Sequence, residues 1–100
     1  MPDICLTLLC HAELEERVLD ALLLTPQLTI FTSTPIFVHG LAHSGLEESE
    51  QVLGRADCVQ VQALMPEDAG REVVERIKIE FAGARMRYWL TPVIASGACA

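Results

Sequence analysis

The alternation of apolar and polar residues divides the first quarter of the chain into a strand and a helix. Residues 4–10 alternate in period two but are apolar on both faces, which predicts an inner strand. Residues 11–25 change to helical spacing, with Leu14, Val18 and Leu22 on one side and acidic residues elsewhere. Pro26 is expected to end this helix.

Three further strands are expected along the rest of the chain. Residues 28–39 are rich in β-branched and aromatic side chains, so they predict a long strand in which Pro35 marks an edge position or a bulge. Residues 56–65 alternate with period two and predict a third strand. Residues 85–95 alternate in the same way and predict a fourth, followed by a frayed tail.

A second helix is predicted between the third and fourth strands. Pro66 and the two acids after it are typical of a helix start, and Gly83 is typical of a helix end. The apolar face of this helix consists of five residues at helical spacing: Ala69, Val73, Val74, Ile77 and Phe81. The resulting order is β-α-β, a loop, and β-α-β. It predicts one α+β domain over residues 1–100, a ferredoxin-like βαββαβ fold with a four-stranded antiparallel sheet and both helices on one face.

The connection between the second and third strands is long. Residues 40–55 contain three glycines, His43 and an acidic patch at Glu47, Glu48 and Glu50. Loops of this length inside compact domains are uncommon and tend to carry function. We therefore expect this segment to be mobile and to take part in the activity.

The chain has more apolar material than one small domain needs. It is 51% hydrophobic over 100 residues, and its mean hydropathy is +0.34. Thr29, Phe31 and the apolar second faces of the first and fourth strands are expected on the sheet face away from the helices. Since a monomer would leave that face in water, the pattern predicts an oligomer.

Charge and targeting signals exclude several functions. Fourteen acids against seven bases give a net charge of −7, which would repel nucleic acid, so no nucleic-acid partner is expected. No apolar run approaches the roughly 18 residues needed to cross a bilayer, so no membrane insertion is expected. The N-terminus lacks the basic and apolar regions of a signal peptide. These features predict a cytoplasmic protein whose cysteines Cys5, Cys10 and Cys58 act as small buried hydrophobes.

Several motifs together resemble one superfamily over nearly the whole chain. They are Leu14-Glu15-Glu16-Arg17, His39-Gly40 with His43 and Gly45, Glu50-Gln51-Val52, Gly54-Arg55, Tyr88-Trp89 and Pro92-Val93. With the strand and helix order, they resemble the PII and CutA superfamily, whose members form trimers. The resemblance is closest to a PII-like family of unassigned function that is often encoded beside heavy-metal efflux systems.

The resemblance implies a role and a set of ligand-binding residues. The role is that of a homotrimeric regulator, which senses a metal ion, a nucleotide or another anion through residues 40–55. It would act on a protein partner such as a membrane-transport or efflux component in heavy-metal resistance. The implied ligand-binding residues are Gly40, Gly45, Gln51, Arg55, Arg85 and Arg87. The chain departs from the PII pattern in residues 81–87, which have one glycine and no lysine. We therefore expect a weak phosphate cradle, in which Arg85 and Arg87 hold an anion.

A divalent transition metal ion is the candidate cofactor. His39 and His43 flank the start of the loop, and Glu50 offers a carboxylate, so these three residues form the candidate metal site. The alternative is a solvated loop whose histidines make local hydrogen bonds, because only two good nitrogen ligands are present. His11 is expected to open the first helix rather than to bind metal.

Other functional classes stay open or are disfavoured. A metal-binding accessory protein of the CutA type and a ligand-free structural adaptor are the alternatives to a regulator. An enzyme is not expected, because the chain lacks a nucleophile elbow, a P-loop and an HExxH motif. Tyr88 and Trp89 are expected to pack in the sheet and a subunit interface, unless a pocket surrounds them.

Overall fold

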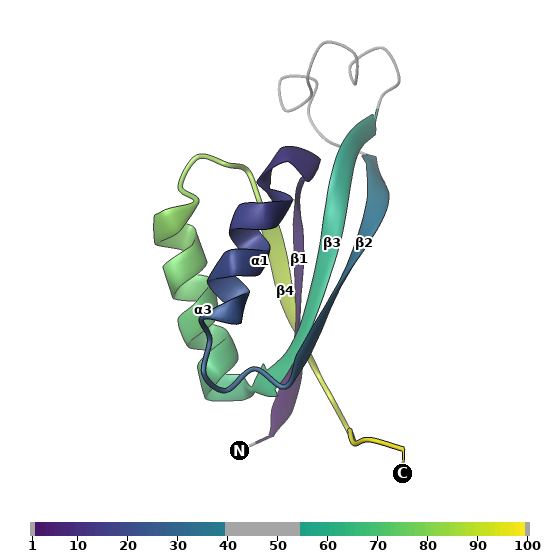
Figure 1. Ribbon diagram of the computed structural model, residues 1–100, viewed down its shortest axis with the longest axis vertical. Helices are drawn as coiled ribbons and strands as arrows, with labels where there is room; N and C mark the ends of the chain where they lie inside the picture. The colour runs from purple at the N-terminus through teal and green to yellow at the C-terminus, as the bar shows by residue number, and fades with distance from the viewer. Residues whose placement is uncertain (1, 40–54, 100) are drawn as a thin grey trace.

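The computed structural model describes residues 2–39 and 55–99, which form one antiparallel sheet and a helical layer (Figure 1). The elements in chain order are β1 (Asp3–His11), the short 3-10 helix η1 (Ala12–Leu14), α1 (Glu15–Leu23), β2 (Ile30–His39), β3 (Arg55–Pro66), α3 (Glu67–Glu80) and β4 (Arg87–Pro92). The strand order in the sheet is β2-β3-β1-β4. The predicted ferredoxin-like fold is confirmed. β1 is an inner strand and Pro35 lies on the edge strand β2, as expected.

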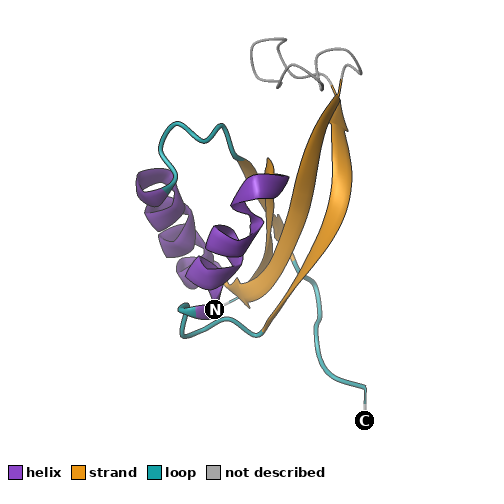
Figure 2. Cartoon of the chain, turned by 45° about the horizontal axis from the view of Figure 1, so that its top comes forward, coloured by secondary structure: helices purple, strands orange, loops and turns teal. Residues whose placement is uncertain are grey.

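The core lies between the sheet and the two helices. In the register of β1 and β3, the buried side chains of one strand pair with those of the other: Ile4 with Met65, Leu6 with Ala63, Leu8 with Val61, and Cys10 with Val59. Val18 and Leu22 of α1 are fully buried against this layer. All five residues predicted for the apolar face of the second helix are buried as well. Figure 2 shows that both helices cover the same side of the sheet.

Several element boundaries differ from the predictions. The first helix was expected from residue 11, but His11 still belongs to β1 and α1 covers only nine residues. The fourth strand was expected over 85–95 but spans Arg87–Pro92. Its start is delayed because Gly83 and Arg85 have φ angles of 82° and 58°, in the left-handed region that no strand adopts. Its pairing stops at Pro92, opposite Ile4, because β1 itself begins at Asp3.

Phe31 does not lie on the sheet face where it was expected. It pairs with the buried Ala63, so it faces the helices and packs against the core. The other face, called the open face below, is formed by alternate residues: Cys5, Thr7 and Leu9 of β1, Gln60, Gln62 and Leu64 of β3, Ile30 of β2, and Trp89 and Thr91 of β4. This face mixes apolar and polar side chains. Ile30 is 56% exposed and Trp89 is 44% exposed.

The C-terminal residues leave the sheet after β4 and extend away from the body of the molecule (Figure 1). The Val93 amide donates a hydrogen bond of 3.1 Å to the Asp3 carbonyl. The Ser96 hydroxyl donates to the Asp3 carboxylate at 3.3 Å. Cys10 and Cys58 are buried and Cys5 is half-buried, whereas Cys99 is exposed in this tail. Among the helices that the structure describes, none combines the length and the apolar composition of a membrane span.

Candidate functional site

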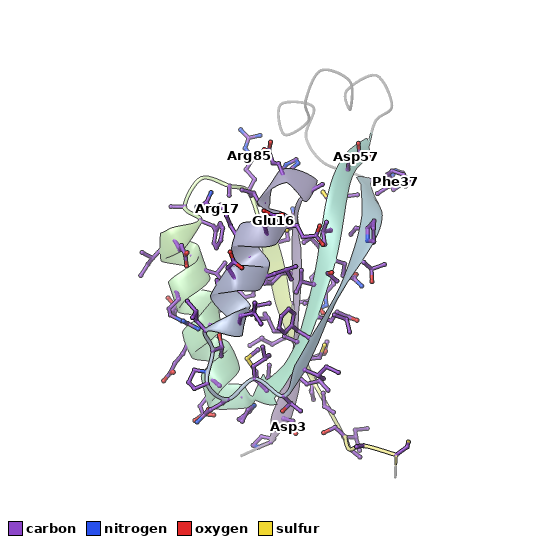
Figure 3. The ribbon with its side chains drawn as sticks, in the orientation of Figure 1. Asp3, Glu16, Arg17, Phe37, Asp57 and Arg85 are labelled. Carbon is purple, nitrogen blue, oxygen red and sulfur yellow. The ribbon has the colours of Figure 1, made fainter. Side chains whose placement is uncertain are left out.

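Three chain segments that carry predicted site residues meet at one end of the sheet, called the upper edge below. β2 ends there at His39, β3 begins there at Arg55, and the two residues are paired. β4 begins at the same end, because Arg87 pairs with Leu9 near the end of β1. The turn between α3 and β4 also lies there, and Figure 3 shows the side chain of Arg85 at this end. The fold therefore gathers His39, Arg55, Arg85 and Arg87 at one end of the molecule.

The other predicted site residues lie outside the described part of the chain. These are Gly40, His43, Gly45, Glu50 and Gln51, so their roles stay predictions. His39, the one predicted metal ligand in the described residues, is exposed at the end of β2. Within residues 2–39 and 55–99, no group of three histidine, cysteine or acidic side chains could hold a metal ion.

The turn between α3 and β4 is tight and contains two left-handed residues. The Phe81 amide donates to the Ile77 carbonyl at 2.9 Å, and the Ala84 amide donates to the Phe81 carbonyl at 3.0 Å. Gly83 follows with φ 82° and Arg85 with φ 58°. Glycine adopts this conformation readily, but an arginine does so at a cost. The turn therefore fixes where β4 starts and where Arg85 and Arg87 leave the backbone.

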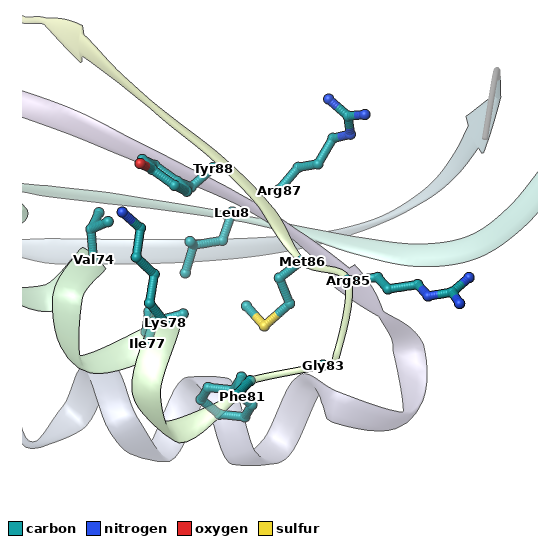
Figure 4. A pocket seen from close by; sticks show the side chains of 11 residues that line it. Leu8, Val74, Ile77, Lys78, Phe81, Gly83, Arg85, Met86, Arg87 and Tyr88 are labelled. Atoms are coloured by element: carbon teal, nitrogen blue, oxygen red, sulfur yellow. The ribbon is translucent and has the colours of Figure 1, made fainter. Parts of the chain in front are cut away.

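A cavity of about 280 Å³ lies beneath this turn, between α3 and β4 (Figure 4). Its floor is formed by core residues: Leu8, Val74, Ile77 and Phe81. Met86 lines one wall, while Lys78, Arg85 and Tyr88 lie around the rim. Arg87 also borders the cavity, but its pairing with Leu9 places its side chain toward the open face. Three of the chain's seven lysine and arginine residues line this one cavity. None of the described lining residues is acidic, although the chain carries a net charge of −7.

Lys78 is held in place at the rim by two neighbours. Its ammonium nitrogen lies 5.4 Å from the centre of the Tyr88 ring and 3.4 Å from the Glu75 carboxylate. The hydrogen bond with Tyr88, followed by the Glu75 charge, raises the pKa of Lys78 above its ordinary value. Lys78 therefore carries a positive charge at neutral pH. In Figure 4 its amino end lies beside Tyr88, whereas the guanidinium ends of Arg85 and Arg87 extend outward.

The cavity changes the interpretation of Tyr88 and identifies a residue that sequence reasoning missed. Tyr88 pairs with Leu8 and lines the cavity, so it is the member of the Tyr-Trp pair with a pocket beside it. Trp89 pairs with Thr7 on the open face. Lys78 had no functional interpretation in the sequence. Two features of the sequence could have indicated Lys78. It is the only lysine of an acidic chain, and it follows Ile77 of the predicted apolar helix face.

A second cavity, of about 350 Å³, lies between the end of α1 and the start of α3. Its lining includes Thr25, Gln27, Asp68, Glu72 and Arg76. The Arg76 guanidinium donates a hydrogen bond of 2.9 Å to the buried Thr25 hydroxyl. This bond joins α3 to the segment after α1, at the opposite end of the helices from the upper edge.

A family model described as "Protein of unknown function (DUF3240)" matches residues 1–100. The chain belongs to the DUF3240 family. A search of curated proteins finds no significant match to this DUF3240 chain.

Solved structures show which folds the DUF3240 chain is similar to. A DUF3240 family protein from Shewanella baltica OS155 matches with a TM-score of 0.82 and 14% identity, over 100% of this chain and 99% of the other. CPII, a nitrogen regulatory PII-like protein from Thiomonas intermedia K12, was solved with ADP, AMP and bicarbonate. It matches with a TM-score of 0.74 and 13% identity, over 99% and 98% of the two chains.

A putative PII-like signalling protein from Thermus thermophilus is also similar. It matches with a TM-score of 0.68 and 16% identity, over 93% of this chain and 88% of that one. Because the identities are low, these similarities show the fold alone. They confirm that the DUF3240 chain has a fold of the PII-like kind.

Proposed function

We propose that this protein is a cytoplasmic PII-like regulator, not an enzyme, which binds a small anionic ligand at the upper edge and thereby changes its contact with a protein partner. The observation that carries the proposal is the positive rim of the cavity in an otherwise acidic chain. Lys78 and Arg85 lie beside one opening, Arg87 extends outward next to it, and no described lining residue is acidic. Such an arrangement favours an anion over a cation.

The structural neighbours support an anionic ligand. CPII was solved with ADP, AMP and bicarbonate, and each of these carries negative charge. Arginine side chains bind phosphate and carboxylate groups through paired, charge-assisted hydrogen bonds. The turn of this chain has one glycine, so it offers few backbone amides for a phosphate cradle. The proposal therefore gives the main role to the side chains of Arg85 and Arg87.

The position of the binding residues suggests how ligand binding would reach a partner. Residues 40–54 connect His39 to Arg55, and both of these positions lie at the upper edge with the turn. The proposal assigns the partner contact to this connection. A ligand can switch such a contact only if it binds one of two arrangements more tightly. A metal-efflux component is the partner that the family resemblance favours.

The proposal includes a homotrimer in which the open face is buried between subunits. Trp89 and Ile30 are each about half exposed on this face in the single chain. Large apolar side chains at such positions favour a subunit contact over solvent. The metal-binding accessory protein and the ligand-free adaptor stay as alternatives. The first depends on His39, His43 and Glu50, of which only His39 is described.

Isothermal titration calorimetry tests the proposal. The purified protein is titrated with ADP, AMP and bicarbonate, and then with Zn²⁺, Cu²⁺, Ni²⁺ and Co²⁺. Arg85→Asn removes one charge while Asn still accepts the left-handed φ, and Arg87→Gln removes the other. Each variant is expected to weaken anion binding about tenfold or more, since a charge-assisted hydrogen bond contributes about 1.5–3 kcal/mol.

A matched control separates the loss of a contact at this site from the general electrostatic effect of removing one positive charge. Arg71→Gln removes an arginine that pairs with Glu67 at 3.0 Å in the first turns of α3, so anion binding should not change. Anion affinity that is unchanged in both Arg85→Asn and Arg87→Gln would refute the proposed site. Binding of a metal ion alone, lost when His39 and His43 are replaced by Ala, would favour the accessory protein. No binding of either kind would favour the adaptor.

A further inference from the structure

We infer that the cavity beneath the α3–β4 turn holds the apolar body of a small organic acid, whose charged group is bound by Lys78. The inference rests on the proposed function and deepens it, since it names the chemical class of the ligand. A bare inorganic anion would use only the charged rim. An organic acid would use the rim and the floor together.

The floor of the cavity is apolar and rigid. Leu8 is 1% exposed, Phe81 is 6% and Ile77 is 7%, so these side chains are already fixed by core packing. A preformed apolar surface loses little entropy when it accepts a ligand. Because the floor itself is almost dry, the apolar area that a ligand would cover lies mainly on Met86 and Tyr88, and its burial contributes about 25 cal/mol per Å². A ligand without an apolar body would gain nothing from this surface.

Two of the walls suit a flat or flexible apolar group. Met86 is half-buried and lines one side, and methionine side chains adapt to the shape of a bound group. Tyr88 lines another side, with its ring 5.4 Å from the Lys78 ammonium. An aromatic ring beside a fixed cation can contact a ligand's body while the cation binds its carboxylate. The charge and the apolar surface are therefore placed for one amphipathic molecule.

The size of the cavity limits the body of the ligand. Its volume is about 280 Å³, whereas ligand pockets commonly range from about 300 to 1,000 Å³. This space suits a single ring or a short aliphatic chain. Negative charge is favoured, because the charged groups among the described lining residues are all cationic, although Glu75 already contacts Lys78 at 3.4 Å. The ligand class is thus a small aromatic or aliphatic acid.

Five probes separate the contributions of charge and apolar body. Benzoate and hexanoate carry both, acetate and inorganic phosphate carry charge with little or no body, and benzyl alcohol carries a body without charge. Calorimetry should show benzoate or hexanoate binding at least tenfold more tightly than acetate, phosphate and benzyl alcohol. Equal affinity of acetate and the larger acids would overturn the inference. So would equal affinity of benzyl alcohol and benzoate, or no binding of either acid.

The only lysine of the chain provides a second readout. Mass spectrometry can follow acylation of Lys78 by an amine-reactive reagent, with the N-terminal amine as an internal reference. Benzoate should slow the acylation of Lys78 but not that of the N-terminus. Lys78→Met keeps an apolar stem without the charge and should lower benzoate affinity at least tenfold, while Arg71→Gln should leave it unchanged. Benzoate affinity that survives in a folded Lys78→Met protein contradicts the assignment.

These experiments can fail independently of those on the proposed function. If ADP or bicarbonate binds and responds to Arg85→Asn, but benzoate and hexanoate do not bind, the regulator stands and the ligand class is wrong. If an organic acid binds and responds to Lys78→Met while Arg85→Asn and Arg87→Gln have no effect, the cavity is the site and the arginine rim is not.

Discussion

Gly70 of α3 lies directly against Ile4 of β1, and a Cβ atom at position 70 would come within 2.6 Å of Ile4 Cδ1. In an ordinary helix, glycine to alanine adds about 1 kcal/mol of stability. Here we expect Gly70→Ala to lower the free energy of unfolding by about 1 kcal/mol, because overpacking commonly costs about 1–3 kcal/mol. Urea denaturation measures the difference.

The partner substitution Ile4→Val removes the clashing atom and tests the cause. Alone it should cost about 1 kcal/mol, since it removes one buried methyl group. Combined with Gly70→Ala, it should restore much of the loss, so the two changes should be coupled by about 1 kcal/mol. Gly97→Ala is the control, because no atom lies within 4 Å of a Cβ there. Strict additivity of the two changes would contradict the clash.

The hydrogen bond between Arg76 and Thr25 is expected to stabilise the junction of the two helices. Thr25→Val keeps the side-chain shape but removes the hydroxyl that accepts this 2.9 Å bond. It should lower the free energy of unfolding by about 1 kcal/mol. Arg76→Ala should have a similar effect, and the double variant should lose less than the sum. A full double-mutant cycle by chemical denaturation measures the coupling, and a coupling near zero would show that the bond is not stabilising.

The left-handed residues of the α3–β4 turn should respond oppositely to substitution. Gly83→Ala should destabilise the fold by about 1 kcal/mol, because φ is 82° at this position. No atom lies within 4 Å of a Cβ added there, so a steric clash would not contribute. Arg85→Asn should leave the thermal midpoint unchanged or slightly raised, since Asn accepts the left-handed region more readily. A large loss of stability in Arg85→Asn would mean that the arginine side chain supports the turn.

The buried thiol of Cys10 should make stability fall at alkaline pH. Burial, with smaller contributions from Cys58 and Glu15, raises the pKa of Cys10 from 9.0 to about 11. The folded state favours the protonated thiol. Its contribution to the free energy of unfolding is therefore complete below pH 9 and is lost as the pH rises through about 11. The loss is on the order of 2 kcal/mol.

Comparison with Cys10→Ala isolates this contribution from the other groups that titrate at high pH. The stability advantage of the wild type over Cys10→Ala should shrink between about pH 8 and pH 11 in urea denaturation. Alkylation gives a second check, because the thiolate is the reactive form. Exposed Cys99 should react first at about pH 8 and Cys10 last. A constant difference between the two proteins across this pH range would contradict the raised pKa.

The trimer is tested by light scattering coupled to size exclusion. At micromolar concentration the mass should be three times 11.0 kDa. Trp89→Lys places a charge on the open face and should dissociate the assembly, since a buried unpaired charge is costly at an interface. Ile79→Lys is a matched control, because Ile79 is 81% exposed on the helical layer. A stable wild-type monomer would overturn this part of the proposal.

Local periodicity was enough to predict the order of the elements, but not which face each residue of β2 occupies. The pattern of β1 showed two apolar faces, that of β3 showed period-two alternation, and the residues on the apolar face of α3 were predicted correctly from their spacing. In β2, polar and apolar residues do not alternate cleanly. Phe31 was therefore assigned to the wrong face, since only the register with Ala63 decides it.

The candidate site was predicted in part. Arg85 and Arg87 were named from the sequence because a family pattern drew attention to the turn after the second helix, and their role in ligand binding stays a prediction. Lys78 and Tyr88 were not found as a pair, because about ten residues and a turn separate them and only the packing of α3 beside β4 brings them together. Long-range contacts of this kind leave no local pattern in the sequence.

Tyr88 and Trp89 are adjacent in β4, yet one faces the cavity and the other faces the open face. Because the two residues share one short stretch of backbone, we expect any displacement of Tyr88 on ligand binding to alter the surroundings of Trp89. A change in the emission of the chain's single tryptophan would then report occupation of a site on the other side of the sheet. If ligand binding also changes the subunit contact at Trp89, thermodynamic linkage requires ligand affinity to depend on protein concentration.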